Sequence, residues 1–230
     1  MKKLMIYLTL ALVTMGAVFT VTSCSKDDVK EDLTIGGKTD FAENKVGSKK
    51  SGIIALDGSD VGMTSESVVT ENKDGIITVK FKIFVPNDMK KRVSDLAEKY
   101  FGDELAKYLI YWNDAEGTFN PIFRFKNSTE GFAFVNPDGS QTVVMKYDAK
   151  VGDKWTGTLI NGKKGTFKTT YRSDTDDYDY AFFKIKVVKI ESTANEPGLT
   201  KVVYIGNHKF GLVGMEYHLE DGTVTKVIVI

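Results

Sequence analysis

Apolar and polar residues alternate along most of the chain after residue 60. Residues 76–85 place one apolar set on a single face of an extended segment: Ile77, Val79, Phe81, Ile83 and Val85. Residues 182–187 repeat the pattern, with Lys184 and Lys186 on the outer face. This period of two is typical of antiparallel sheets that have one packed face and one face in water.

Short turn signals separate the alternating segments. The pairs Asp74-Gly75, Asp138-Gly139, Asn161-Gly162 and Asp221-Gly222 favour tight hairpins, because both central residues need a positive φ. We count about ten strands, and a twisted sheet of about that size curls up or splits into two layers. The sequence therefore predicts a mainly β (α+β) fold, with a curved antiparallel sheet that forms a half-barrel or barrel.

Two segments depart from the alternation. Residues 88–112 carry apolar side chains at helical spacing, and Asn87 or Asp88 can cap the start, so one helical insertion is expected near residues 88–112. This insertion would lie across the concave face of the sheet or plug one end. Residues 227–230 are all aliphatic, which predicts a final strand that is buried on both faces and that the fold requires.

The first residues of the chain have the architecture of a secretory signal. Lys2 and Lys3 precede a long apolar run, which ends in Val21-Thr22-Ser23-Cys24. The run is also long enough for a transmembrane span. The last four residues resemble the lipobox of bacterial lipoproteins. That resemblance implies removal of residues 1–23 as a signal peptide and acylation of Cys24, with palmitate among the attached chains.

Lipidation would consume the only thiol of the protein. The chain contains one cysteine, so the folded part would then have no disulfide and no cysteine available for catalysis or metal binding. Ser25-Lys26-Asp27-Asp28 resembles the acidic tag of surface-exposed lipoproteins from Gram-negative gut anaerobes. The two resemblances together imply a protein anchored to the outer membrane, at the cell surface.

Composition divides the remainder of the chain. Almost half of residues 25–50 are charged, which favours a flexible tether over residues 24–50 that starts at Cys24. Residues 51–230 have the length and composition of a single β-rich domain. The formal net charge of the chain is zero and lysines and arginines do not cluster, so nucleic acid is not an expected partner.

A second resemblance covers residues 146–220. The segments Val151-Gly152-Asp153-Lys154-Trp155, Gly165-Thr166-Phe167 and Phe210-Gly211-Leu212-Val213 resemble a strand start, a short motif and a hairpin of secreted and lipid-anchored β-rich domains from Gram-negative bacteria. The resemblance implies turns at Gly152 and Gly165 and a core position for Trp155. It also implies that the domain could be a curved sheet holding a lipid or another apolar ligand.

The chain offers little catalytic chemistry. No nucleophile motif is present, and His208 and His218 are the only histidines, without metal-ligand spacing. We therefore expect no cofactor and no enzymatic activity, with a hydrolase as a distant alternative.

Aromatic residues form the best candidate ligand site. These residues are Tyr108, Tyr111 and Trp112, followed by Phe119 and Phe123, with Tyr178 and Tyr180 as a second group. Aromatic side chains bind sugar rings and lipids, although an aromatic stripe at helical spacing is more often core.

An acidic cluster is a weak candidate for a metal site. Asp174, Asp176, Asp177 and Asp179 could hold Ca²⁺, but the EF-hand pattern fails, and a solvated hairpin tip is the alternative. The sequence thus favours a non-enzymatic binding module for a small apolar or glycan ligand. A structural or accessory subunit that docks on another outer-membrane protein is the alternative.

Overall fold

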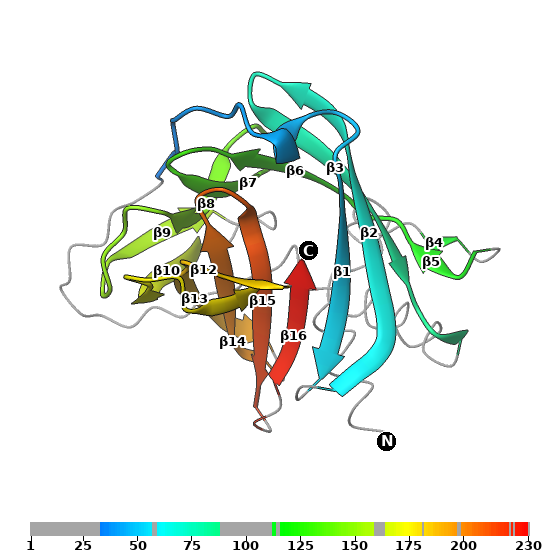
Figure 1. Ribbon diagram of the computed structural model, residues 1–230. Coiled ribbons are helices and arrows are strands. Elements are labelled where there is room, and N and C mark those ends of the chain that lie inside the picture. The colour runs from blue at the N-terminus through cyan, green and yellow to red at the C-terminus, as the bar shows by residue number, and fades with distance from the viewer. Residues whose placement is uncertain are drawn as a thin grey trace.

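The described part of the protein is almost entirely β-sheet (Figure 1). The computed structural model describes residues 33–56, 59–87, 112–113, 116–158, 164–180, 182–196, 199–220, 222 and 224–229. Within these ranges the helical structure is one short 3₁₀ turn, η1 (Ala42–Asn44). The predicted helical insertion of residues 88–112 lies outside the described residues except for Trp112, which begins a strand.

Twelve strands form one continuous antiparallel sheet that curls into a nearly closed barrel. In chain order they are β1 (Lys49–Leu56), β2 (Ser59–Lys73), β3 (Ile76–Phe84), β6 (Ile122–Asn127), β7 (Gly131–Val135), β8 (Gln141–Lys146), β9 (Lys154–Thr158), β10 (Lys164–Arg172), β13 (Val188–Glu196), β14 (Leu199–Asn207), β15 (Gly211–Leu219) and β16 (Val224–Val229). Their order around the barrel is β8-β7-β6-β3-β2-β1-β16-β15-β14-β13-β10-β9. The predicted curved antiparallel sheet is confirmed.

Two small hairpins accompany the barrel. β4 (Trp112–Asn113) pairs with β5 (Thr118–Phe119), which itself pairs with the end of β3. β11 (Tyr178–Tyr180) and β12 (Phe183–Ile185) form a separate two-stranded sheet. This second hairpin covers the outer side of β14 and β15, where Tyr180 and Ile185 pack with Val203, Ile205 and Val213.

The first and last strands of the barrel join each other. β16 pairs with β1 on one side, from Gly52↔Val229 to Leu56↔Thr225, and with β15 on the other. The two ends of the strand order, β8 and β9, meet through side chains. Trp155 Nε1 donates to the carbonyl oxygen of Val143 at 2.6 Å, and Asn136 Nδ2 donates to that of Thr158 at 3.0 Å. These bonds hold the seam between β8 and β9.

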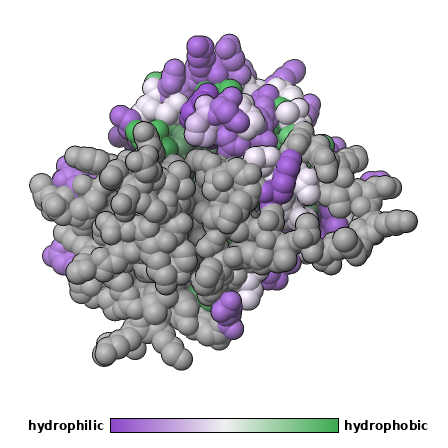
Figure 2. Space-filling model, turned by 180° about the vertical axis from the view of Figure 1, so that it is seen from behind, coloured by the Kyte–Doolittle hydropathy of each residue, from purple (hydrophilic) through white to green (hydrophobic). Residues whose placement is uncertain are grey.

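Alternation places the apolar face inside the barrel. Ile77, Val79, Ile83 and Val85 are buried in the main core, and Phe81 packs against it. Lys80, between two of them, is exposed. On β15, Met215 and Tyr217 are likewise buried. The outer surface at the upper end of the molecule is mainly hydrophilic (Figure 2), as expected for the wet face of such a sheet.

Several local predictions are confirmed. Asp74 and Gly75 both have positive φ, 53° and 79°, and join β2 to β3 in a tight turn. Gly152 has φ 99° in the turn before β9. Trp155 is 2% exposed and its ring stacks on Phe167 with centroids 6.1 Å apart.

Other local predictions are wrong. Gly165 lies within β10, paired with Gly157, and not in a turn. The last strand is buried on one face only: Val227 is 3% exposed but Ile228 is 36% exposed. Each residue of an antiparallel strand alternates between the barrel interior and the outside, so a run of aliphatic residues does not by itself bury both faces.

The predicted tether, residues 24–50, is too long, because its second half belongs to the folded body. Within the described part of it, residues 33–50, Ile35 is 2% exposed and packs against Ala133 and Val143. Asn44 Nδ2 donates to the carbonyl oxygen of Asn127 at 2.8 Å. These contacts fix the segment on β6, β7 and β8, so the folded body begins before residue 51. Residues 24–32 and Cys24 lie outside the described residues.

In the part of the chain that the structure describes, no helix is long and apolar enough to cross a membrane.

Candidate functional site

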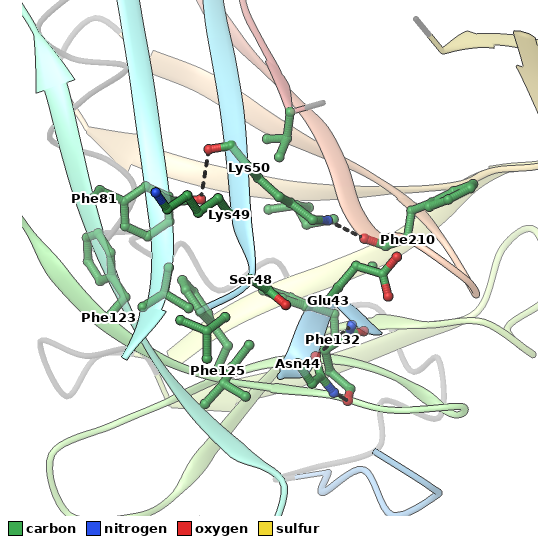
Figure 3. A pocket seen from close by; sticks show the side chains of 18 of the residues that line it. Glu43, Asn44, Ser48, Lys49, Lys50, Phe81, Phe123, Phe125, Phe132 and Phe210 are labelled. Carbon is green, nitrogen blue, oxygen red and sulfur yellow. Dashed lines mark hydrogen bonds between the residues drawn. The ribbon is translucent and has the colours of Figure 1, made fainter. Parts of the chain in front are cut away.

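A cavity of about 330 Å³ opens inside the barrel beneath η1 (Figure 3). Its walls come from β1, β2, β3, β6, β7, β15 and β16, and from Phe210 in the turn before β15. Ala42, Glu43 and Asn44 of η1 lie at its rim. The volume falls at the lower end of the range for small-molecule sites, about 300–1,000 Å³.

Phenylalanines dominate one wall of the cavity. They are Phe81, Phe123, Phe125, Phe132 and Phe134. Phe125 lies among the other four, with ring centroids 5.2 Å from Phe132, 5.2 Å from Phe134, 6.0 Å from Phe123 and 6.3 Å from Phe81. Such tilted and edge-on contacts hold the rings in a fixed arrangement. The wall therefore presents a preformed apolar surface.

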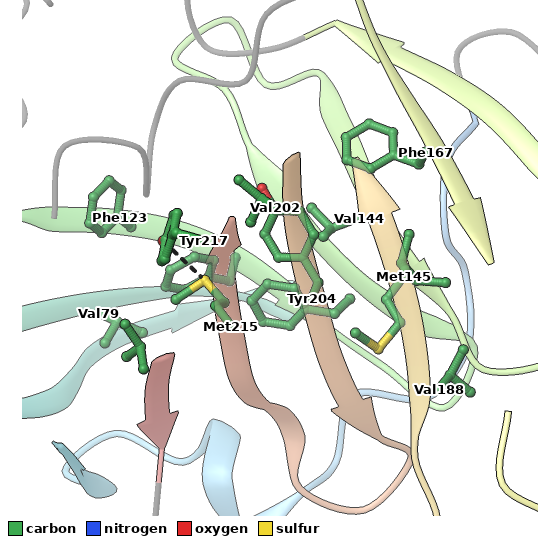
Figure 4. Packing of buried hydrophobic residues seen from close by; sticks show 14 of the residues in the cluster. Val79, Phe123, Val144, Met145, Phe167, Val188, Val202, Tyr204, Met215 and Tyr217 are labelled. Atoms are coloured by element: carbon green, nitrogen blue, oxygen red, sulfur yellow. Dashed lines mark hydrogen bonds between the residues drawn. The ribbon is translucent and has the colours of Figure 1, made fainter. Parts of the chain in front are cut away.

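Aliphatic side chains complete the cavity, among them Val69, Val79 and Met215. Met215 also belongs to the packed cluster that continues into the barrel with Tyr204 and Tyr217 (Figure 4). Burial raises the pKa of Tyr204 far above the ordinary range of a phenol, so this side chain is neutral at physiological pH. The interior next to the cavity is thus packed and uncharged.

The rim of the cavity is polar. Asn44 and Asn127 bond to each other through Asn127 Nδ2 and Asn44 Oδ1 at 3.2 Å. Ser48 Oγ donates to the carbonyl oxygen of Ala42 at 2.6 Å. Lys50 extends from β1 across the opening, and its Nζ donates to the carbonyl oxygen of Phe210 at 2.7 Å (Figure 3). Burial lowers the pKa of Lys50, and the negative charge of Glu43 partly opposes this change.

This arrangement suits a ligand with an apolar body and a polar end. The apolar body would contact the phenylalanine wall, while the polar end would meet the side chains at the rim. Nothing in the arrangement resembles a nucleophile activated by a neighbouring base.

Tyr178 and Tyr180 of the predicted aromatic residues do not line this cavity. Tyr108, Tyr111 and the side chain of Trp112 lie outside the described part of the chain, in which Trp112 is placed by its backbone on β4. Tyr180 contacts the site from outside, since its ring lies 5.4 Å from that of Phe210. Tyr178 lines a second, smaller cavity of about 260 Å³ with Glu216 and Lys226. Phe123, which was also considered from the sequence, lines the cavity.

Two aspartates of the acidic cluster form hydrogen bonds or an ion pair with nearby residues. Asp177 accepts hydrogen bonds from Ser173 Oγ at 2.6 Å and from the hydroxyl of Tyr171, and Asp179 pairs with Lys184 at 3.3 Å. Among the described residues, which include all four aspartates, no three histidine, cysteine or acidic side chains converge on a metal-binding position. The aspartates are exposed to solvent, but they lie in β11 and in its connection to β10, which do not pair with each other, and not at a hairpin tip.

The sequence interpretation missed most of the cavity residues. Phe125, Phe132 and Phe134 lie in two short alternating runs, Phe123-Arg124-Phe125 and Phe132-Ala133-Phe134, and this spacing is a readable signal for one aromatic sheet face. The position of Lys50 in the cavity could not be predicted from the sequence, because Lys50 lies in the charged segment assigned to the tether.

Comparisons with known proteins give weak likenesses. No protein-family model matches the sequence, and no curated protein matches it. A candidate exported protein of Bacteroides fragilis with a YmcC-like fold is similar with a TM-score of 0.45 at 6% identity, over 81% of this chain and 95% of that chain. A candidate lipoprotein of Parabacteroides distasonis follows with a TM-score of 0.39 at 8% identity, over 81% and 94%.

A third similar structure is the hypothetical protein CT021 of Chlamydia trachomatis, with a TM-score of 0.34 at 10% identity, over 78% of this chain and 85% of that chain. Two of the three are thus an exported protein and a lipoprotein candidate from Bacteroidetes. All identities are low and all TM-scores lie below 0.5, so the function proposed next rests on this chain's own residues.

Proposed function

We propose that this protein is a lipid-anchored envelope protein whose barrel binds a small apolar ligand in the cavity beneath η1. The observation that carries the binding role is a space of about 330 Å³ lined by six phenylalanines. A cavity of this size in an otherwise packed interior costs stability, because its lining atoms lack partners on one side. A ligand that fills it supplies the missing contacts.

The lining favours an apolar ligand over a glycan. Sugar sites need many polar groups that converge on the hydroxyls, in addition to an aromatic platform. Here the polar groups, including Asn44 and Asn127, are at the rim and largely bonded to one another or to the backbone. The open space also favours a binding role over a purely structural subunit, for which a filled core is expected.

A neutral fluorescent probe, N-phenyl-1-naphthylamine, tests the binding role. The chain from Ser25 onward retains every described strand and avoids the signal and the lipid. We expect the probe to bind this chain with a rise in fluorescence. Val79→Trp, which fills the cavity, should weaken binding about tenfold or more, because Val79 lines the space.

Ile122→Trp is the matched control. Ile122 lies on the neighbouring strand, opposite Lys80 in register, and is 45% exposed on the outer surface. This variant should bind the probe like the unmodified chain. Absence of probe binding to the unmodified chain, or equal binding by both variants, would refute the proposed cavity function.

The lipid anchor is a separate part of the proposal. Its support is the signal architecture and the box Val21-Thr22-Ser23-Cys24. A single acyl chain anchors only marginally, whereas two or more anchor stably. Labelled palmitate should therefore enter the protein in living Gram-negative bacteria and be lost in Cys24→Ala. Equal labelling of both forms, or none of either, would exclude the anchor without affecting the cavity.

A further inference from the structure

Packing alone does not explain the charged side chain of Lys50, which lines the cavity together with Glu43 and Lys49. The register of β1 places Lys50 and Gly52 on its inner face, whereas the neighbouring residues Lys49 and Ser51 are exposed. The lysine stem thus crosses the cavity opening and brings a positive charge to an apolar space (Figure 3).

The ammonium group of Lys50 uses only part of its hydrogen-bonding capacity within the described residues. An ammonium has three donors, and Lys50 Nζ uses one of them on the carbonyl oxygen of Phe210. Among the residues that the structure describes, no carboxylate lies within 4.0 Å of Nζ. Within the described residues, two donors of Nζ are therefore left for another group, and Glu43 opposes the charge only from beyond 4.0 Å.

A partly buried charge without a counter-ion is unfavourable for folding. Moving an ammonium away from water costs free energy unless an opposite charge or further hydrogen bonds compensate. The lowered pKa of Lys50 agrees with this cost, since burial is its largest cause. A methionine of similar length would line the same space without the cost, so the charge itself calls for a function.

We infer that the cavity binds a single-chain amphiphile with a carboxylate head, and that Lys50 holds this head at the rim. This inference rests on the proposed function and names the class of ligand. The carboxylate would accept the two free donors of Nζ, while the alkyl chain would lie along the phenylalanine wall. A charge-assisted bond of this kind is stronger than one between neutral groups.

The size of the cavity limits the chain. At about 30 Å³ for a group the size of a water molecule, a space of about 330 Å³ accepts about ten methylene-sized groups. A medium-length fatty acid such as dodecanoate fits this estimate, whereas a phospholipid with two long chains exceeds it.

Glu43 at the same rim affects the affinity for a charged ligand. It lines the cavity, and its negative charge acts on Lys50. It therefore opposes an incoming carboxylate, and its neutralisation should strengthen binding. An amine head would reverse this expectation, because Glu43 would then attract the head and Lys50 would repel it.

Calorimetric titration of the chain from Ser25 onward with dodecanoate, dodecan-1-ol and dodecylamine, each below its micelle concentration, tests the inference. Dodecanoate should bind about tenfold or more tightly than the alcohol, and the amine should bind most weakly. Lys50→Met should reduce the preference for dodecanoate over the alcohol to about one, while the alcohol still binds.

Two further variants complete the test. Lys80→Met removes an exposed lysine from neighbouring β3 and should keep the full preference for dodecanoate. Glu43→Gln should raise the affinity for dodecanoate about twofold or more. Equal binding of dodecanoate and dodecan-1-ol, tighter binding of the amine, or an unchanged preference in Lys50→Met would overturn the carboxylate assignment and leave the apolar cavity standing. Failure of all three compounds to bind would overturn the proposed function together with it.

Discussion

Replacement of Trp155 by phenylalanine tests how the barrel closes. β8 and β9 are the two ends of the strand order, and side chains join them. The indole Nε1 donates to the carbonyl oxygen of Val143 at 2.6 Å, from a side chain that is 2% exposed. Trp155→Phe removes this donor and leaves a small space beside Phe167.

The expected loss in the free energy of unfolding of Trp155→Phe has two contributions. Loss of the donor to a buried carbonyl costs about 1–3 kcal/mol. The smaller ring adds about 1 kcal/mol for the space that it leaves. We therefore expect the free energy of unfolding to fall by about 3 kcal/mol, which lowers the Tm of a domain of this size by about 6–12 °C.

Urea titration and hydrogen exchange provide the assay. Amides of β8 and β9 should exchange faster in Trp155→Phe than in the unmodified chain, while those of β1 and β16 should change less, because a full backbone ladder joins them. Ile122→Ala, at a position that is 45% exposed on β6, serves as the control with a smaller loss. A change below about 0.5 kcal/mol in Trp155→Phe would refute the role of this side chain in closure.

Three further outcomes follow from the structure. Burial holds the pKa of Lys50 below its usual 10.5, so the unfolded chain keeps this proton to higher pH, and stability gains as pH rises towards 10.5. Lys50→Met should lose this gain in urea titrations between pH 7 and 10, and a parallel profile would contradict the burial of the charge. Hydrogen bonds from Ser173 and Tyr171 hold the pKa of Asp177 below its usual 3.8, so their stabilisation is present above that pH and is lost as pH falls below it. Tyr171→Phe should therefore make unfolding less sensitive to pH between 2 and 4, as followed by circular dichroism, and an unchanged acid transition would count against the bond. Deletion of residues 224–230 removes β16 from between β1 and β15 and should abolish cooperative unfolding; a folded truncated chain would show that the barrel does not need this strand.

Much of the fold could be predicted because alternation and turn chemistry act locally. The inner face of β3 follows directly from the spacing of Ile77, Val79 and Phe81. The turn at Asp74-Gly75 follows from the need for positive φ at both positions. Strands that pair with sequence neighbours then give the meander, and a long twisted meander curls.

The site could not be predicted in the same way, because tertiary contacts decide it. Ile35 and Asn44 lie in a segment whose composition resembles a tether, yet each contacts a strand about 80–110 residues later in the chain. Lys50 appears in the sequence as one of many charged residues of that segment. Only the register of β1 turns it to the inner face of the barrel.

A structure of the chain from Ser25 onward with bound dodecanoate tests the central claim most directly. We expect an alkyl chain between Phe125 and Met215, with a carboxylate oxygen within hydrogen-bond distance of Lys50 Nζ. An empty cavity at saturating dodecanoate, or a ligand found only on the outer surface of the barrel, would contradict it.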